Sequence, residues 1–265
     1  MKIRNFAIIT LVAFPFASNG GGGPKVPYAK AAAAVQNKFA PLIKDNPKKA
    51  SAEYLKAAKQ LAEHYPKETG PWMLMMQAAT YSGNEQIKIG VLNEMADHEN
   101  PQLSGVALRF MSMMWKQSNP IGKPFQLQFT GIDGKQVDLA KLKGKVVLID
   151  FWATWCGPCV AEIPNLVKTY NEFHDQGFEI VGIALEGNKD PKRLQAYVAR
   201  KNMPWPQYTD GLMWKNKIAQ RYGINGVPTM WLIDREGNLS SLTARINLKN
   251  KVKKLLAEKS TSTSN

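Results

Sequence analysis

The chain has two cysteines, Cys156 and Cys159, and they stand three residues apart at one point of the sequence. They follow residues 146–151, a run that is apolar except for Asp150, as in a strand that is buried on both faces. The segment after them has a helical pattern as far as the breaker Gly177. A cysteine pair that joins a buried strand to a helix restricts this part of the chain to an α/β arrangement.

The place of this pair at the start of a helix indicates redox chemistry. The N–H groups in the first turn of a helix have no partners, so they stabilise a thiolate and lower the pKa of a cysteine beside them. Cys156 is nearer to the helix end and is the predicted nucleophile, while Cys159 lies one turn on and is predicted to resolve the mixed disulfide. Pro158 is compatible with the first turn because no N–H is needed there.

A Cys-x-x-C pair can also be one half of a zinc site, which needs two further ligands. The three histidines, His64, His98 and His174, are each isolated in the sequence. Two methionine-rich stretches, at residues 73–76 and 111–114, offer thioethers that can bind copper(I), although methionine also fills gaps between packed helices. We favour packing for the methionines, and we expect neither a metal nor another cofactor.

From residue 121 onward, strand-like and helix-like segments alternate. Two hairpin signals are centred on the turns at residues 131–134 and 234–238. The other predicted elements are a strand at 178–185, helices at 191–201 and 211–222, strands at 230–233 and 239–242, and a basic helix at 248–259. This order predicts an α/β domain with a central sheet over residues 121–259, followed by a disordered tail at 260–265.

Residues 29–119 have no strand-like alternation and are rich in Ala, Lys, Leu, Met and Gln, which favour helices. Helix breakers recur at nearly even spacing, mostly as a residue followed by proline, and each marks a predicted helix end. The spacing predicts helices of similar length, arranged as an array of hairpins of the α-solenoid kind or as a plain bundle. We expect this region to act as a spacer, a dimerisation surface or a docking module.

The first twenty residues have the order of a secretory signal: a short basic segment, an apolar stretch at residues 6–16, and then small residues. The alternative is a buried amphipathic helix, but the glycines at 20–23 cannot continue a packed helix. We expect residues 1–20 to be a signal peptide and residues 21–28 a Gly/Pro linker. Such a protein is exported to the periplasm or cell envelope, which is an oxidising compartment.

Composition excludes several other classes of protein. With 44% hydrophobic and 21% charged residues, the chain is not a wholly disordered one. No apolar run reaches the roughly 18 residues that a membrane-spanning helix needs, so we expect peripheral or no membrane association. The net charge of +14 favours anionic or acidic partners, but no nucleic-acid motif accompanies it, and we expect no nucleic-acid binding.

Two motifs carry a resemblance to thioredoxins. Residues 147–159, Val-Leu-Ile-Asp-Phe-Trp-Ala-Thr-Trp-Cys-Gly-Pro-Cys, resemble their active-site segment, and residues 222–229, Tyr-Gly-Ile-Asn-Gly-Val-Pro-Thr, resemble the loop that holds a cis-proline. Three further features are similar to the exported TlpA/ResA-like branch of the superfamily, to which AhpC/TSA proteins are related. They are the leading hairpin at 125–139, Glu162 three residues after the pair, and the long gap before Pro228. The resemblance implies a thioredoxin-like α/β fold, with a central mixed sheet flanked by helices, preceded by an all-α N-terminal region.

The resemblance also implies roles for individual residues. Cys156 and Cys159 match the redox pair, and Pro228 matches the cis-proline that lies against it and presents the backbone of the preceding residue to a substrate strand. Asp150 matches a buried aspartate that accepts the proton of the resolving cysteine; alternatively it is a structural buried group. The residues expected to contact substrate are Trp155, Gly157, Pro158, Val227 and Glu162.

The sequence departs from the branch at Asp150, where many TlpA/ResA-like proteins carry asparagine. The lysine that partners this aspartate in thioredoxins has no counterpart in residues 178–185, which leaves the ionisation of Asp150 open. The Gly157-Pro158 dipeptide matches reducing members. The resemblance thus implies a thiol-disulfide oxidoreductase that reduces disulfides of bacterial envelope proteins, apocytochrome c among them. Its electrons would come from a membrane thiol donor of the DsbD/CcdA type.

Two other functions are compatible with parts of the sequence. Thr154, two residues before Cys156, faintly matches a peroxiredoxin-like peroxidase, but the upstream proline-threonine frame of that class is absent and a tryptophan precedes the cysteine. The other alternative is an adaptor that acts through the helical region. The intact redox motifs argue against an inactive site of that kind.

Overall fold

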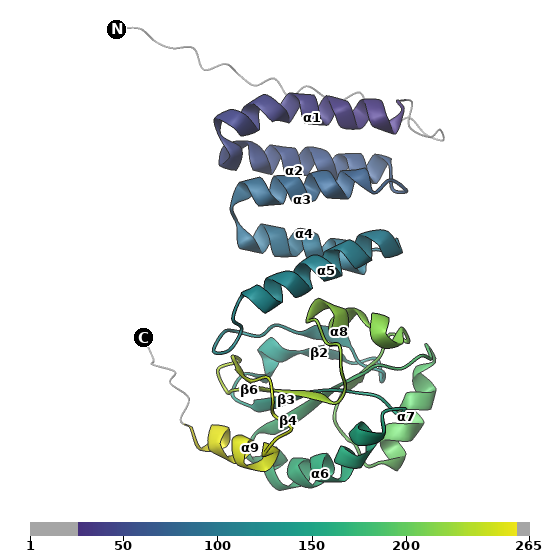
Figure 1. The fold of residues 1–265 in the computed structure, drawn as a ribbon, viewed down its shortest axis with the longest axis vertical. Coiled ribbons are helices and arrows are strands. Elements are labelled where there is room, and N and C mark those ends of the chain that lie inside the picture. The colour runs from purple at the N-terminus through teal and green to yellow at the C-terminus, as the bar shows by residue number, and fades with distance from the viewer. Residues whose placement is uncertain (1–25, 259–265) are drawn as a thin grey trace. The chain divides into compact units, whose positions relative to one another are not determined.

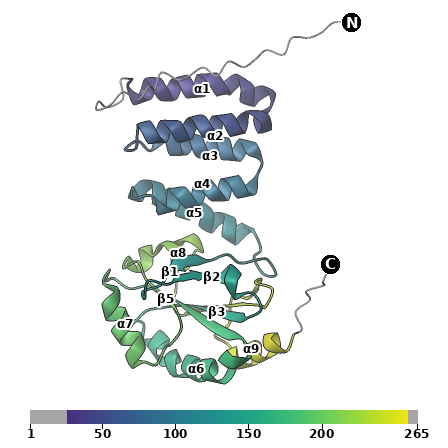
Figure 2. The same cartoon turned by 180° about the vertical axis from the view of Figure 1, so that it is seen from behind.

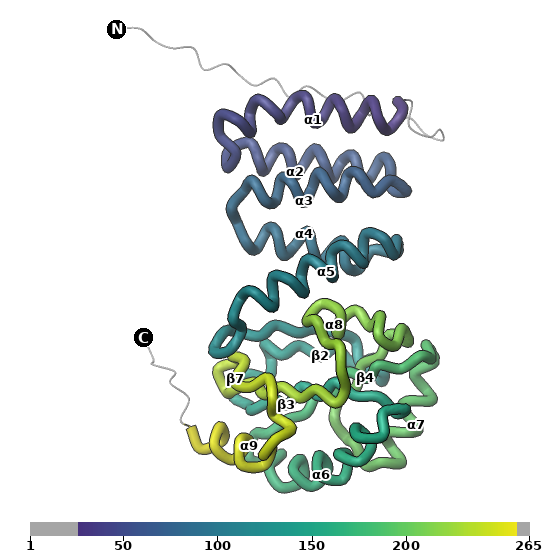
Figure 3. Tube along the Cα trace, in the orientation of Figure 1, coloured from purple at the N-terminus to yellow at the C-terminus, as the bar shows by residue number. Residues whose placement is uncertain are grey.

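The computed structural model describes residues 26–258, and the chain divides into two compact units, Met1–Ser104 and Gly105–Asn265. Figures 1 and 2 show the helices and strands from opposite sides, and Figure 3 follows the Cα trace. The predicted signal peptide, most of the predicted linker and the predicted tail at 260–265 lie outside the described residues.

The described part of the first unit is helical, as predicted. Its elements are α1 (Tyr28–Asp45), α2 (Pro47–His64), α3 (Gly70–Ser82), α4 (Glu85–Asp97) and the first residues of α5 (Pro101–Gln117). From α1 to α4, each helix packs against the next one in the sequence, and short turns join them (Figure 1). This succession of neighbour contacts fits the hairpin array better than the plain bundle.

The helix breakers act through local hydrogen bonding and backbone conformation. Asn46 caps α2, and its side chain accepts a hydrogen bond from the backbone N–H of Lys49 at 3.1 Å, with Pro47 in the first turn. Gly83 ends α3 with a φ of +63°, a conformation that glycine adopts without steric cost. The breaker pattern therefore marks real helix boundaries.

Apolar side chains fill the space between these helices. The rings of Phe39 in α1 and Tyr54 in α2 stack with their centroids 5.0 Å apart. Met75 and Met95 are fully buried, whereas Met73 is half exposed. Core packing is thus confirmed for Met75 of the stretch at 73–76, while Met95 lies outside both methionine-rich stretches. Met75 and Met95 thus behave as gap-filling residues between helices.

The second unit contains the predicted mixed sheet, with the strand order β5-β4-β3-β6-β7. The central strands, β3 (Val146–Trp152) and β4 (Phe178–Ala184), are parallel and buried along their whole length, as their apolar runs predicted. β6 (Thr229–Ile233) pairs antiparallel with β3, and β7 (Leu239–Ser241) pairs antiparallel with β6. The short edge strand β5 (Gln207–Tyr208), which the sequence did not predict, runs parallel to β4.

Helices cover both faces of this sheet, and the leading hairpin forms a separate two-stranded sheet. The hairpin strands are β1 (Gln128–Thr130) and β2 (Gln136–Asp138), and the helices are α6 (Gly157–Phe173), α7 (Pro191–Arg200), α8 (Lys217–Arg221) and α9 (Leu248–Ala257). Within this unit, α6 and α9 lie on one side of the sheet and α8 on the other (Figures 1 and 2). The fold is thioredoxin-like, as the two motifs implied.

The predicted helix at 211–222 is wrong over its first half. Gly211 and Met213 have φ values of +71° and +50°, which an α-helix does not allow. The carboxylate of Asp210 instead accepts hydrogen bonds from the backbone N–H groups of Leu212 and Lys217, at 3.1 and 2.8 Å. The segment is therefore a loop with a single 3-10 turn, and the α-helix is confined to α8.

An aromatic cluster joins α5 to the sheet within the second unit. The ring of Trp115 stacks on Trp231 of β6 with centroids 5.5 Å apart, and it also meets Phe125 and Tyr222 edge to face. Trp231 in turn meets Phe151 of β3. The second unit thus includes most of α5, although residues up to 119 were predicted to belong to the helical region.

Candidate active site

The cysteine pair lies where β3 gives way to α6. Cys156 is the N-cap residue of α6, and its sulfur accepts a hydrogen bond from the backbone N–H of Cys159 at 3.2 Å. The two residues form a disulfide, so the structure represents the oxidised protein. This is the placement at a helix start from which the sequence predicted redox chemistry.

The two cysteines differ slightly in solvent exposure. Cys156 is 6% exposed and Cys159 is 3% exposed, so both are nearly buried and Cys156 is the more accessible. Gly157 and Pro158, the first residues of α6, are exposed. The first turn of α6 therefore borders the pair with exposed surface.

The loop before β6 lies against the pair. The Val227–Pro228 peptide bond is cis, as the resemblance implied, and the carbonyl oxygen of Val227 lies 3.7 Å from Sγ of Cys156. Thr229 pairs with Phe151 at the start of β6, which anchors this loop beside the end of β3. The pairing of β3 with β6 thus brings Val227 next to Cys156, the predicted nucleophile.

Asp150 lies inside the sheet, between Gly182 of β4 and Met230 of β6. It is 2% exposed, and its Oδ1 atom has no hydrogen-bond partner. Burial, and to a smaller extent the negative charge of Glu162, together raise the pKa of this carboxyl to about 7. The group can therefore hold or release a proton near neutral pH, which a proton acceptor for a thiol requires.

Glu162 lies one turn after Cys159 on α6. Its Oε1 accepts a hydrogen bond from Nε of Arg245 at 3.0 Å, and its Oε2 accepts one from the amide of Asn165 at 3.4 Å. The resemblance implied that Glu162 contacts substrate; within the protein its contacts are with Arg245, Asn165 and, electrostatically, Asp150. Arg245 was not anticipated, because it lies far along the chain in a segment without a motif.

Trp155 precedes the nucleophile and presents its ring to solvent. Its Nε1 donates to the carbonyl of Leu185 at 2.9 Å, and its ring meets that of Trp214 with centroids 5.7 Å apart. The carboxylate of Glu186 accepts hydrogen bonds from the backbone N–H and the hydroxyl of Thr154, at 2.7 and 3.0 Å. Glu186 and Trp214 were not predicted from the sequence. A signal for the first was its position directly after a buried strand.

Two of the three histidines contact an aromatic ring. His98 packs against Trp72, and His174 stacks on Tyr170. In residues 26–258, no group of three or more His, Cys, Asp or Glu side chains could hold a metal ion. Within the same residues, no helix is both long and apolar enough to cross a membrane.

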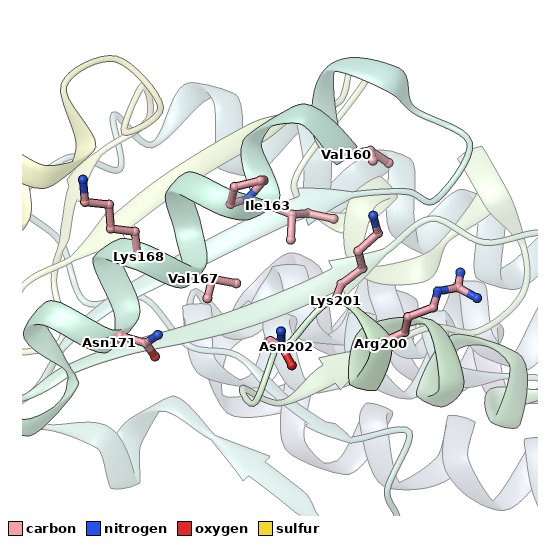
Figure 4. A pocket seen from close by; sticks show the side chains of 9 residues that line it. Val160, Ile163, Val167, Lys168, Asn171, Arg200, Lys201 and Asn202 are labelled. Carbon is pink, nitrogen blue, oxygen red and sulfur yellow. The ribbon is translucent and has the colours of Figure 1, made fainter.

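A cavity of about 620 Å³ lies along α6, between this helix and the turn that follows α7 (Figure 4). Its floor is apolar, with Val160, Ile163 and Val167, and Lys168 and Lys201 stand at its edges. The predicted site residues are not among those that line it. The predicted site thus lies at the junction of β3 and α6, and this cavity is lined by other residues.

Comparison with known proteins identifies relatives of the second unit. The model of the AhpC/TSA family matches residues 121–241. The thiol-disulfide oxidoreductase ResA of Bacillus thuringiensis (strain Al Hakam) is 34% identical over 125 residues, which are 47% of this chain and 69% of the relative. ResA of Bacillus subtilis (strain 168) is 34% identical over 107 residues, which are 40% of this chain and 57% of the relative.

Solved structures of similar proteins each cover about half of the chain. One is the thioredoxin domain of a thiol-disulfide oxidoreductase from Bacteroides vulgatus, with 30% identity and a TM-score of 0.43, covering 50% of this chain and 94% of that one. Another is a thiol:disulfide interchange protein of the thioredoxin family from Chlorobium tepidum TLS, with 31% identity and a TM-score of 0.43, covering 52% of this chain and 98% of that one.

Proposed function

This chain belongs to the ResA-like thiol-disulfide oxidoreductases of the thioredoxin superfamily, and we propose that it reduces protein disulfides in the bacterial cell envelope through Cys156 and Cys159. The observation that carries the proposal is the cysteine pair at the N-terminus of α6, with the cis-proline loop against its first sulfur. The signal-like order of residues 1–20 supports export.

The reaction begins from the reduced protein. The Cys156 thiolate attacks one sulfur of the substrate disulfide, and the other substrate sulfur leaves as a thiolate that takes up a proton. The first turn of α6 stabilises the attacking thiolate through its N–H groups. The product of this step is a mixed disulfide between Cys156 and the substrate.

Resolution then closes the disulfide present in this structure. Cys159 loses its proton and attacks Sγ of Cys156, which releases the second substrate thiol. Asp150 is the proton acceptor in our proposal, because its pKa of about 7 allows it to be ionised at neutral pH and to take up a proton. Two electrons pass from the cysteine pair to the substrate, and a membrane thiol donor of the DsbD/CcdA type would restore the reduced pair.

Trapping of the mixed disulfide tests the proposal. In a Cys159→Ser protein the reaction stalls after the first step, so covalent adducts that dithiothreitol reverses are expected in the native host. The adducts should be absent from a Cys156→Ser protein and should contain envelope proteins, with apocytochrome c and the membrane donor among them. Recovery of cytosolic proteins alone would contradict export, and an oxidising midpoint potential of the pair would contradict the reducing direction.

The contacts of Thr154 weigh against the peroxidase alternative. The hydroxyl of Thr154 donates to Glu186, so it is committed to a carboxylate rather than available to a peroxide at Cys156. Consumption of peroxide by the purified protein through Cys156, with no disulfide substrate trapped, would favour the peroxidase nonetheless. The adaptor alternative predicts instead a phenotype that needs only residues 29–119.

A further inference from the structure

An apolar ridge lies beside the nucleophile on the surface of the second unit. It consists of Trp155, Leu212, Met213 and Trp214, whose exposed fractions are 45%, 36%, 42% and 42%. Three of these residues are consecutive, and the ring of Trp214 meets that of Trp155. Adjacent large apolar side chains on a surface, as opposed to scattered ones, are typical of a binding surface.

Hydrogen bonds hold the ridge in place. The carboxylate of Asp210 accepts from the backbone N–H groups of Leu212 and Lys217 and from the side chain of Asn216, at 3.1, 2.8 and 3.2 Å. The backbone N–H of Met213 donates to the carbonyl oxygen of Glu186 at 3.0 Å. The exposure of the ridge is therefore a property of a fixed loop, and little ordering is needed when a ligand covers it.

The same residues tie the ridge to the active site. Glu186 holds Met213 through its carbonyl and Thr154 through its carboxylate, so one residue fixes both the loop and the segment before the cysteine pair. The indole N–H of Trp155 is satisfied by the carbonyl of Leu185, which directs the hydrogen-bonding edge of this ring inward. The ring face that remains exposed offers apolar contact one residue from Cys156.

The ridge is near enough to meet a polypeptide substrate. When a cysteine of such a substrate is bonded to Cys156, the residues next to that cysteine come close to Trp155, which directly precedes Cys156 and is exposed. Burial of a large apolar side chain stabilises a complex, and aromatic pairs add to that stabilisation. A polar side chain at this place would cover the ridge without such a gain.

We propose that the ridge is a specificity surface, and that the enzyme prefers disulfides whose cysteine is flanked by an aromatic or large apolar residue. This inference depends on the proposed function and names its substrate class. The occupant is the side chain next to the attacked cysteine of the substrate polypeptide. Substitution of Trp214 tests the ridge separately from the cysteine pair, because Trp214 lies outside the Cys156–Cys159 segment and its replacement leaves that segment unchanged.

Two symmetric peptide disulfides test the proposal. Acetyl-Gly-Phe-Cys-Gly-amide and acetyl-Gly-Ser-Cys-Gly-amide, each oxidised to its dimer, present equivalent sulfurs and differ only in the residue before the cysteine. The full-length reduced protein is mixed with each peptide, and after acid quenching the released peptide thiol is separated from the protein by chromatography and measured, because the total number of thiols does not change in the reaction. For the native protein we expect a second-order rate constant about ten-fold higher for the phenylalanine peptide, the effect of about 1.4 kcal/mol.

Variants of the ridge should change this ratio. Trp214→Ala and Leu212→Ala should reduce the ten-fold preference toward one, and Trp214→Phe should retain most of it. Leu242→Ala, which removes a comparably exposed apolar side chain outside the ridge, should leave the ratio at the native value. The proposal would be overturned if the native protein showed no preference for the phenylalanine peptide, or if Trp214→Ala kept the native preference. Failure of the native protein to reduce either peptide would instead contradict the proposed function.

Discussion

Arg245 donates a hydrogen bond through Nε to Glu162, and Glu162 is the carboxylate whose charge acts on the buried Asp150. Arg245 follows the last strand of the sheet, whereas Glu162 lies on the active-site helix. In this ion pair, Arg245 partly offsets the negative charge of Glu162, and so weakens its effect on Asp150, the proposed proton acceptor. The proton affinity of the site is therefore set by residues from three separate segments.

Neutralising Glu162 should lower the pKa of Asp150. In Glu162→Gln the charge that disfavours ionisation of Asp150 is gone, while burial of Asp150 remains, so its pKa should fall from about 7 but stay above the ordinary value. Arg245→Gln should move the pKa in the opposite direction, because Glu162 then keeps its charge without the neighbouring cation. NMR titration of the Asp150 carboxyl carbon measures both shifts. Equal titration in all three proteins would contradict the electrostatic link.

Asp150→Asn should slow resolution of the mixed disulfide more than its formation. The carboxylate is proposed to take the proton of Cys159, so release of substrate should slow by at least about ten-fold above pH 7, where Asp150 is ionised. Below about pH 6 the native carboxyl is protonated, and the two proteins should converge. Stopped-flow measurement on a preformed mixed disulfide checks this, and an unchanged release rate at pH 8 would leave Asp150 a purely structural role.

The same substitution should stabilise the folded protein at alkaline pH. Because the folded-state pKa of Asp150 is raised from 3.8 to about 7, the native state binds the proton more tightly than the unfolded state does. The contribution of Asp150 to the free energy of unfolding should thus fall by up to about 4 kcal/mol as the pH rises from about 4 to about 7. Above about pH 7 this contribution should stay level. Oxidised Asp150→Asn should lack this decline and exceed the native protein in stability at pH 8.

Urea unfolding at pH 4 and pH 8 measures the effect. The advantage of Asp150→Asn should be present at pH 8 and absent at pH 4, where both side chains are uncharged. Asp175→Asn, at an exposed position in the same unit, serves as the control and should not alter the pH dependence. An equal difference between native and Asp150→Asn at both pH values would show that packing, and not ionisation, is responsible.

Iodoacetamide should label the reduced protein first at Cys156. This residue caps α6 and is the more exposed of the pair, whereas Cys159 lies inside the first turn. Mass spectrometry after brief reaction at mildly acidic pH identifies the labelled residue. Faster labelling of Cys159 would reverse the assignment of nucleophile and resolving cysteine.

Removal of the Trp115 side chain should destabilise the second unit. Trp115 is partly buried against Phe125, Tyr222 and Trp231, so Trp115→Ala should cost about 2 kcal/mol. Met113→Ala removes an exposed side chain from the same helix and should change the stability by less than about 0.5 kcal/mol. Calorimetry of the second unit compares the two variants. Equal unfolding temperatures would mean that Trp115 contributes nothing to this unit.

The parts of the fold that were predictable depend on local sequence signals. The apolar runs of β3 and β4, the helix start at Cys156 and the turn residues around Asn46 each act through nearby residues, and the structure has them where expected. The cis bond before Pro228 followed from a motif resemblance rather than from local physics.

The parts that were not predictable depend on contacts between distant segments. The loop at 211–216 has a helical composition, but the carboxylate of Asp210 and the contact of Met213 with Glu186 hold it in another conformation. The pairing of Arg245 with Glu162 likewise needs the fold to bring the segment between β7 and α9 next to α6. The Asp210-Gly211 dipeptide was the one turn signal in this loop that the sequence offered.

The stacking of Trp115 on Trp231 limits how this redox unit can be joined to other chain segments. The family model begins at residue 121, yet a transfer of the unit to a new N-terminal partner at that point would leave Trp231 without the ring that covers it. A fusion partner would have to end in a helix that carries an aromatic residue at the position of Trp115. A segment transferred by gene fusion or domain exchange should accordingly begin before Trp115 and not at residue 121, where the family match begins.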